Sequence, residues 1–208
     1  MQVYNRYLLP YLTHFAMRMP MLDAYRREVV RQARGNVLEL GAGSGLNLAL
    51  YEPRLVSRVY ALEPEPGMIR LARTRLTEAA VPVEILPVGA EAIPLPDCSI
   101  DTVLSTWTLC TIPDIKAALS QARRVLKPNG QFLFVEHGLS NDNAVARWQH
   151  RLTPFWSRCA GGCQLDRPHA NLLRQAGFVI DRLETGYIGR LKPMTYTYRG
   201  QARRADSE

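Results

Sequence analysis

Short apolar runs alternate with amphipathic stretches along most of this chain, which is the pattern of a mainly parallel sheet with helices on both faces. The apolar runs predict strands over 37–40, 58–62, 83–88, 100–105 and 131–136. Stretches of helical periodicity between them predict a helix that begins near residue 46 and further helices over 67–79 and 114–126. The last of these helices should be stopped by Pro128-Asn129-Gly130. We therefore expect an α/β fold.

The two ends of the chain have different patterns. Residues 1–35 are predicted to be helical because apolar side chains recur on one face, although Pro10 should break or kink the helix and Gly35 should cap its end. Beyond residue 141, helices are predicted over 143–156 and 167–176, and strands from 177 and over 194–199. Residues 201–208 are expected to be a frayed tail.

Composition is that of a globular protein with a single domain. The chain has 208 residues, 47% of them apolar, which is enough for one core. No apolar run is long enough to span a membrane and the first residues lack the apolar segment of a signal peptide, so we expect a cytoplasmic protein. The net charge of +7 comes mostly from arginine, and by itself it is compatible with nucleic acid, acidic lipid or an anionic cofactor as partner.

The cysteines raise the question of a metal site. Cys159 and Cys163, with His169 nearby, have the spacing of half a zinc site. No second Cys/His pair follows at a matching interval, and four scattered cysteines do not form a disulfide framework. We therefore expect reduced thiols and no bound metal.

The most informative segment is a glycine-rich turn that follows the first predicted strand, Val37-Leu38-Glu39-Leu40-Gly41-Ala42-Gly43-Ser44-Gly45. Glycine allows a sharp turn and a close approach of the backbone to a ligand. The dinucleotide fingerprint G-x-G-x-x-G requires a glycine where this chain has Leu46, so the spacing disfavours a nicotinamide or flavin enzyme. Glu63 closes the second strand, where a carboxylate can accept hydrogen bonds from two ribose hydroxyls or can simply be solvated.

The early third glycine, preceded by Leu-Glu, resembles motif I of the class I S-adenosylmethionine-dependent methyltransferases, and in particular the type 11 group. The resemblance implies a Rossmann-like fold with a mainly parallel seven-stranded sheet, helices on both faces and an N-terminal helical cap. It also implies S-adenosylmethionine as cofactor and S-adenosylhomocysteine as product. Many relatives carry an acidic residue where this chain has Gly89, so Glu91 or backbone groups are expected to hold the adenine. The cofactor-binding residues that follow from the resemblance are Glu39, Gly41, Ala42, Gly43, Gly45, Glu63, Pro64, Met68, Ala90, Glu91 and Thr106.

The same resemblance divides the single domain, 1–208, into functional parts. Residues 1–35 form the cap or lid, 36–138 the cofactor-binding core, 139–176 a substrate-side helical insert, 177–200 the C-terminal strands and 201–208 the tail. The aromatic stripe of the cap is either a helix packed over the sheet or a lid that excludes water.

Segments outside the cofactor-binding motifs make the resemblance more specific. Tyr4-Asn5-Arg6-Tyr7, Glu136-His137-Gly138 and Gly161-Gly162-Cys163 are similar to the methyltransferase-like 7 group, which includes alkyl-thiol S-methyltransferases, and to bacterial relatives described as phospholipid or ubiquinone/menaquinone methyltransferases. A small, partly apolar thiol is therefore the favoured acceptor, because its pKa needs only a modest shift to give a thiolate. His137 is expected either to act as base or to bond to backbone. Expected catalytic residues are His137, Thr106 and Trp107, and expected substrate-binding residues are Tyr4, Tyr7, Tyr11, Cys110, His137 and Trp148.

Other acceptors and functions stay open. A hydroxyl or amine of a small metabolite, or a lipid or quinone head group, is the alternative within the methyltransferases. An RNA-modifying enzyme would use the positive charge, but Ser105-Thr106-Trp107-Thr108 lacks the Asp/Asn-Pro-Pro-Tyr/Phe motif of base methyltransferases, so nucleic acid is not the expected partner. A protein that binds the cofactor without turnover is the third alternative. Peripheral membrane contact is compatible with the sequence, which does not determine the oligomeric state.

Overall fold

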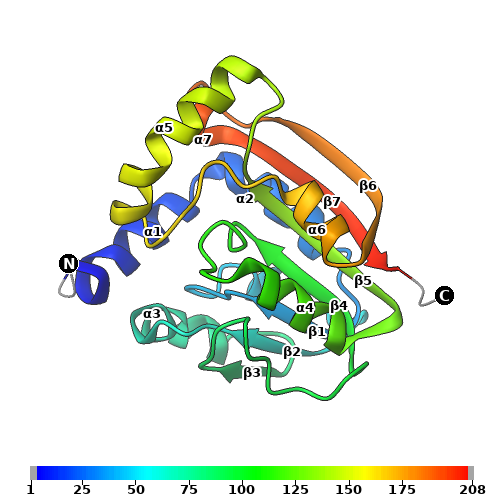
Figure 1. The fold of residues 1–208 in the computed structure, drawn as a ribbon. Helices are drawn as coiled ribbons and strands as arrows, with labels where there is room; N and C mark the ends of the chain where they lie inside the picture. Colours follow the sequence, from blue (N-terminus) through cyan, green and yellow to red (C-terminus); the bar gives the residue numbers. More distant parts are fainter. Residues whose placement is uncertain (1–3, 206–208) are drawn as a thin grey trace.

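A seven-stranded sheet forms the centre of the molecule in the computed structural model, which describes residues 4–205. The strand order is β3-β2-β1-β4-β5-β7-β6 (Figure 1). The first five strands in chain order pair in parallel, whereas β7 pairs antiparallel with both β5 and β6. The expected α/β architecture with a mainly parallel sheet is thus confirmed. The strands are β1 (Gly35–Leu40), β2 (Val56–Leu62), β3 (Val83–Leu86), β4 (Ile100–Thr106), β5 (Leu126–His137), β6 (Phe178–Tyr187) and β7 (Tyr196–Arg204).

Helices cover both faces of this sheet because alternate strand residues are apolar on each side. Val37 of β1 packs in the core with α2 (Pro20–Val30) and α3 (Pro66–Thr77). Its neighbour Leu38 belongs to the opposite core, which contains α4 (Ile115–Val125) and α6 (His169–Gln175). Helix α4 begins where Asp114 accepts a hydrogen bond from the backbone N–H of Ala117, at 3.0 Å.

Two further helices lie across the carboxyl ends of the parallel strands (Figure 1). A π-helical turn, η1 (Tyr4–Leu8), leads directly into α1 (Leu9–Met17), and Pro10 lies in the first turn of α1. The helical conformation continues past Pro10, where a break or kink was predicted, and the interruption comes after Met17, before α2 begins at Pro20. Helix α5 (Asn143–Cys159) packs against the short α7 (Lys192–Thr195). Ligands of open α/β sheets bind at the carboxyl ends of the strands, so α1 and α5 are placed to cover a site.

Two predicted elements near the glycine turn are wrong. The segment after Leu46 forms only η2 (Leu48–Leu50), a 3-10 helix, because Pro53 follows and disfavours helical geometry at the residue before it. Gly35 does not cap a helix: α2 ends at Val30, and Gly35 opens β1 with φ +65° against the Asp101 side chain.

Two predicted boundaries toward the C-terminus also change. Residues 128–130 lie inside β5, whose register with β4 is irregular there, since α4 has already ended at Val125. The last strand runs from Tyr196 to Arg204, so residues 201–204 pair with β5 and β6 and do not fray. Residues 206–208 of the predicted tail lie outside the described residues.

Candidate active site

The glycine turn adopts the conformation for which glycine was expected. Gly41, Gly43 and Gly45 have φ values of +62°, +57° and +76°, which L side chains rarely adopt. A Cβ at Gly41 would come within 2.3 Å of the Thr108 side chain. A Cβ at Gly43 would meet no described atom within 4 Å, so the backbone is uncovered on that side. A ligand can therefore contact the peptide units around Gly43 directly.

Glu63 fastens this turn to the end of β2. Its carboxylate accepts hydrogen bonds from the backbone N–H groups of Gly43, at 2.7 Å, and Glu65, at 2.9 Å. Burial raises the pKa of Glu63, and the two N–H donors oppose that shift by favouring the charged form. The side chain is 7% exposed and lines a cavity, so it retains acceptor capacity on the cavity side.

Glu39 lies behind the turn, buried and away from the cavity lining. Its two oxygens accept hydrogen bonds from Asn47 and from the Tyr51 hydroxyl, each at 2.7 Å. Burial raises the pKa of Glu39, and these two donors counteract part of the shift. Asn47 also donates to Thr106 Oγ1 at 3.1 Å. Glu39 therefore connects the glycine turn to the end of β4.

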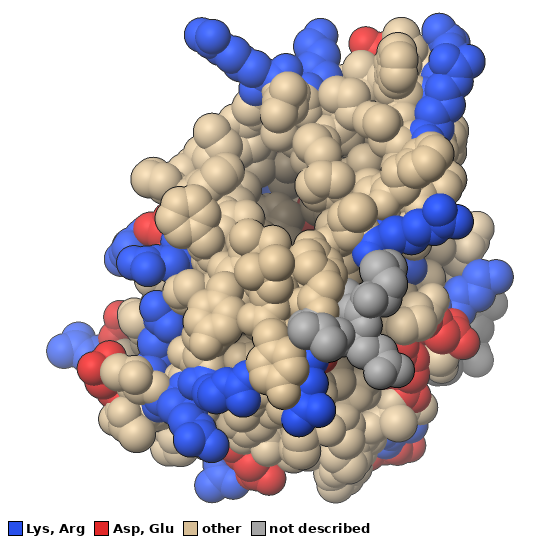
Figure 2. Space-filling view, turned by 90° about the vertical axis from the view of Figure 1, so that its left-hand side faces the viewer, with Lys and Arg blue, Asp and Glu red and all other residues tan. Residues whose placement is uncertain are grey.

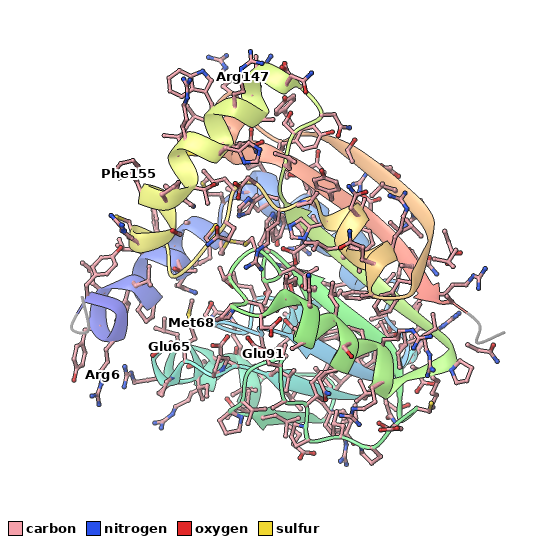
Figure 3. All side chains as sticks on the ribbon, viewed as in Figure 1. Arg6, Glu65, Met68, Glu91, Arg147 and Phe155 are labelled. Carbon is pink, nitrogen blue, oxygen red and sulfur yellow. The ribbon has the colours of Figure 1, made fainter. Side chains whose placement is uncertain are left out.

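A cavity of about 470 Å³ opens at the carboxyl ends of β1, β2 and β4. Its mouth is the hollow in the middle of the largely uncharged face in Figure 2. Figure 3 shows Glu65 and Met68 just below α1, with Glu91 farther toward the middle of the molecule. Among the predicted cofactor residues, Glu39 and Gly45 do not line the cavity. The predicted residues that line it are Gly41, Ala42, Gly43, Glu63, Pro64, Met68, Ala90, Glu91 and Thr106, together with Trp107.

The loop after β3 supplies the far wall of the cavity. A Cβ built at Gly89 would lie 2.5 Å from a carboxylate oxygen of Glu91. The Glu91 carboxylate thus occupies the space that an acidic side chain at position 89 would take. That Glu91 or backbone groups of this loop hold the adenine stays a prediction.

The cap helix α1 covers the cavity with a different face from the one expected. Leu9, Pro10, Thr13, His14 and Met17 line the cavity, and His14 Nδ1 is hydrogen-bonded to Ser44 Oγ at 2.6 Å. The sequence pattern favoured the aromatic stripe, which lies on a different face of α1 from these residues.

The predicted aromatic substrate residues lie elsewhere. Tyr7 and Tyr11 are 55% and 54% exposed, and Trp148 on α5 is 56% exposed. The Tyr4 hydroxyl donates to the backbone carbonyl of Cys159 at 2.7 Å, which joins η1 to the end of α5. None of these four side chains lines the cavity in the described structure.

Known proteins with the same features identify the family. Residues 38–134, which contain the glycine turn and Glu63, match the family described as "Methyltransferase domain". The chain is 30% identical over 193 residues to thiol S-methyltransferase TMT1B of Homo sapiens, an alignment that covers 87% of this chain and 78% of the human protein. The chain belongs to the S-adenosylmethionine-dependent methyltransferases.

Two other relatives extend the comparison. Over 123 residues the methyltransferase is 29% identical to phosphatidylethanolamine N-methyltransferase of Cereibacter sphaeroides, covering 58% of this chain and 60% of that one. The fold matches a crystal structure described as a possible histamine N-methyltransferase from Thermotoga maritima, with a TM-score of 0.64, 21% identity and coverage of 97% and 98%. The cofactor is S-adenosylmethionine.

Two residues that line the cavity of the methyltransferase each have one buried polar atom without a hydrogen-bond partner among the described residues. Arg26 on α2 is 3% exposed, stacks at 5.2 Å over the Trp107 ring and donates to the Met17 carbonyl at 3.1 Å. Its Nε and the Asn47 Oδ1 are buried and have no hydrogen-bond partner among the described residues. Arg26 is also the only arginine or lysine among the described residues that line the cavity.

Trp107 has a strained backbone at the site. It directly follows β4 and has φ +53°. Its backbone N–H donates a hydrogen bond to the Val135 carbonyl at 2.8 Å. Non-glycine residues in this region occur preferentially at functional sites. Buried Glu136 supports the same turn: it accepts from the Ser105 hydroxyl at 2.6 Å and the Thr108 N–H at 3.0 Å.

His137 and Cys110, predicted near the acceptor, lie one layer behind the cavity wall together with Cys163. His137 Nε2 is 3.0 Å from Cys163 Sγ, and the Trp156 indole N–H donates to the same sulfur at 3.2 Å. Burial opposes the charged form of His137, but its hydrogen bond with Cys163 raises the pKa overall. Hydrogen bonds from Cys110 and His137 lower the pKa of the Cys163 thiol to about 4.

Cys159, Cys163 and His169, whose spacing raised the question of a zinc half-site, do not come together. Cys159 is exposed, and His169 Nε2 is hydrogen-bonded to the His137 carbonyl at 2.9 Å. Of these three residues, only Cys163 lies close to both Cys110 and His137.

Proposed function

We propose that this methyltransferase transfers the methyl group of S-adenosylmethionine to the sulfur of a small, partly apolar thiol. The observation that carries the proposal is its similarity to thiol S-methyltransferase TMT1B over 87% of the chain, a span that extends well beyond the cofactor-binding core. The cavity supports an apolar acceptor, because Leu9, Met17 and Ile112 contribute to its lining.

In this proposal, polar groups that line the cavity bind each part of the cofactor. Glu63 accepts hydrogen bonds from the ribose hydroxyls, as carboxylates at the end of this strand can do. The guanidinium of Arg26 pairs with the carboxylate of the amino-acid portion, which satisfies its buried Nε. The uncovered backbone at Gly43 lies against the cofactor between them, and Glu91 holds the adenine.

Catalysis then consists mainly of alignment. The bound cofactor supplies a methyl group that is already activated by its positive sulfur. Thr106 and Trp107, at the end of β4, border the reacting atoms, and the strained turn at Trp107 fixes that wall. Helix α1 excludes water from the cavity through Pro10, His14 and Met17.

A matched set of acceptors tests the nucleophile. With isotopically labelled S-adenosylmethionine, we expect an alkyl or aryl thiol to be labelled, and its alcohol and amine counterparts of the same carbon skeleton to react far more slowly. Labelling of the alcohol or amine with no labelling of the thiol would overturn S-methylation. Failure of S-adenosylhomocysteine to bind in a calorimetric titration would overturn the assignment of the cavity.

We also propose that the enzyme meets its acceptor at an anionic lipid surface. Helices α1 and α5 expose large apolar side chains beside the cavity mouth, and Figure 2 shows basic side chains around this uncharged face. We call this surface the apolar face; it consists of Tyr7, Leu8, Tyr11, Leu12, Phe15, Trp148, Leu152 and Phe155. Arg6, Arg18, Arg147, Arg151 and Arg158 are exposed on the same elements or next to them. Apolar insertion flanked by arginine is how proteins bind anionic interfaces. No helix among the described residues could cross a membrane.

A further inference from the structure

Three soft metal-ligating atoms converge behind the cavity wall. The sulfurs of Cys110 and Cys163 and a ring nitrogen of His137 all lie within 4.8 Å of one another. Zinc bound tetrahedrally at about 2.3 Å from sulfur and about 2.0 Å from nitrogen places its ligand atoms roughly 3.5–3.8 Å apart. The cluster therefore needs only small side-chain adjustments to enclose an ion. We propose that Cys110, His137 and Cys163 bind one Zn²⁺ ion and leave its fourth position to an external ligand.

The three ligands are held in place by segments far apart in the chain. Cys110 follows β4, His137 ends β5, and Cys163 lies between α5 and α6. The Gln164 N–H donates to the Cys110 carbonyl at 2.9 Å, which ties the two cysteine segments together. Arg167 donates to the carbonyls of Leu109 and Ile112 on either side of Cys110, the latter at 2.7 Å. Such cross-links give a preformed arrangement of the kind that metal sites require.

Further contacts match the surroundings of a metal thiolate. The Trp156 indole donates to Cys163 Sγ, and an N–H donor to a ligating sulfur is a usual outer-shell contact. His169 fixes the backbone at His137. Two thiolates and an imidazole select Zn²⁺ over Mg²⁺ or Ca²⁺, which prefer oxygen ligands.

The external ligand that the proposed function supplies is an acceptor thiol, and the cavity wall separates the cluster from the cavity in which the acceptor binds. Cys110 Sγ is 3.7 Å from the Trp107 carbonyl, and Gly161 is two residues from Cys163; both Trp107 and Gly161 line the cavity. A thiol that takes the open position releases its proton and binds as thiolate. Its sulfur then forms the new S–CH₃ bond as the bond between methyl carbon and sulfonium breaks, with that electron pair remaining on the cofactor sulfur. The proposal that an acceptor thiol takes the open position rests on the proposed function. The proposal that the three residues bind zinc does not.

Metal content tests the site, and the two remaining cysteines provide matched controls. We expect the reduced full-length protein, equilibrated with zinc and desalted, to retain about one ion per chain, and Cys110→Ser or Cys163→Ser to retain less than about a tenth of that. Cys98→Ser and Cys159→Ser, at exposed positions outside the cluster, should retain zinc fully. Calorimetry with S-adenosylhomocysteine verifies that the variants are folded, because the cluster does not line the cavity. Absence of zinc in the reduced wild type, or its full retention by Cys163→Ser, overturns the proposal.

Cobalt substitution tests the open position. Co²⁺ in the site should give the intense visible bands of a four-coordinate ion and a near-ultraviolet sulfur-to-metal band that Cys163→Ser weakens. Adding a small thiol should shift these bands, and the corresponding alcohol should not. A spectrum unaffected by thiol overturns the acceptor role of the open position and leaves metal binding established. Neither result alters cofactor binding, so failure of the proposed cofactor cavity is detected separately.

Discussion

At the scale of single residues, Glu63 and Arg26 are two buried charged residues that line the cavity. Glu63 reaches it from the end of β2, and Arg26 reaches it from α2 across the Trp107 ring. The proposed pose assigns each to a different part of the cofactor. Two nucleoside probes separate these roles, because 5′-methylthioadenosine keeps the ribose and lacks the amino-acid portion.

For Glu63→Gln we expect S-adenosylhomocysteine and methylthioadenosine to bind more weakly by a similar factor, equivalent to about 1–3 kcal/mol. Both ligands contain the ribose, and the amide replaces one charged acceptor with a donor. Isothermal titration calorimetry measures both affinities. Unchanged binding of both would remove Glu63 from the ribose site.

The charge of Glu63 also predicts a pH dependence. Burial raises the pKa of this carboxyl, so lowering the pH from neutrality protonates it earlier than an exposed glutamate. The protonated group accepts ribose hydrogen bonds less well, and wild-type affinity should fall as the pH approaches the raised pKa. Glu63→Gln should show a flatter profile in the same titration. Identical profiles would contradict the assignment.

For Arg26→Met we expect a selective loss. The methionine fills most of the volume but cannot pair with a carboxylate, so S-adenosylhomocysteine should bind about tenfold more weakly or worse, which is the range of a charge-assisted hydrogen bond. Methylthioadenosine should bind as it does to the wild type. An equal loss for both ligands would indicate a general disturbance of the cavity.

The charge pattern in the sequence indicated Glu63 and not Arg26, for a physical reason. Glu63 ends a strand next to a glycine turn, and both features are local. Whether Arg26 is solvated or buried depends on how α2 packs beneath Trp107, a residue 81 positions away. The same limit applies to the Cys110, His137 and Cys163 cluster, whose members belong to three segments that only the folded sheet brings together.

At the scale of elements, the cap is held over the cavity by a close approach between α1 and the start of α3. Gly67 is buried in the first turn of α3, and a Cβ there would lie 2.8 Å from Pro10 Cγ and 3.3 Å from the Arg6 carbonyl. Since φ at Gly67 is unstrained for other residues, the effect of a substitution is confined to this contact.

Gly67→Ala should therefore displace α1 and weaken its seal over the cofactor. We expect S-adenosylhomocysteine to dissociate several-fold faster, equivalent to about 1 kcal/mol of overpacking. Gly186→Ala is the matched control, because a Cβ at Gly186 meets no described atom within 4 Å. Stopped-flow displacement measures both rates, and equal rates for the two variants would show that α1 is not part of the seal.

Hydrophobic periodicity predicted the helices and strands well where neighbouring residues determine the structure. It predicted them poorly where contacts with distant residues determine it. The strands of the parallel core appear within a few residues of their predicted positions because their runs are apolar on both faces. Gly35 was misplaced because a glycine serves equally as a helix cap and as a strand start, and the Asp101 contact that decides between them is remote in sequence. The strand pairing that orders residues 201–204 is equally remote.

At the scale of the whole molecule, the cavity mouth and the apolar face lie on the same side, next to the carboxyl ends of the parallel strands (Figures 1 and 2). In Figure 3 the side chain of Phe155 points outward from α5, and Arg147 lies near the start of that helix. An acceptor dissolved in a lipid surface would thus enter the cavity from the side at which the protein binds.

We expect the enzyme to sediment with vesicles that contain anionic lipid and not with purely zwitterionic ones, and added salt should weaken this binding. Replacing Phe15 and Phe155, which are 79% and 70% exposed, by serine should abolish sedimentation. Leu55→Ser is the control, because Leu55 is 51% exposed but directly precedes β2, at the amino ends of the parallel strands. Equal binding by the double variant and the control would exclude the apolar face as the lipid contact.

The positions of the three tryptophans have a practical consequence for studying the enzyme. Trp107 lies in the cavity wall, Trp156 donates to the sulfur of Cys163, and Trp148 is exposed on α5. With Trp148 replaced by phenylalanine, the intrinsic fluorescence would come from one indole at the cofactor cavity and one at the cysteine cluster. Occupancy of the two places can then be followed in a single sample, by emission alone and without attaching a dye.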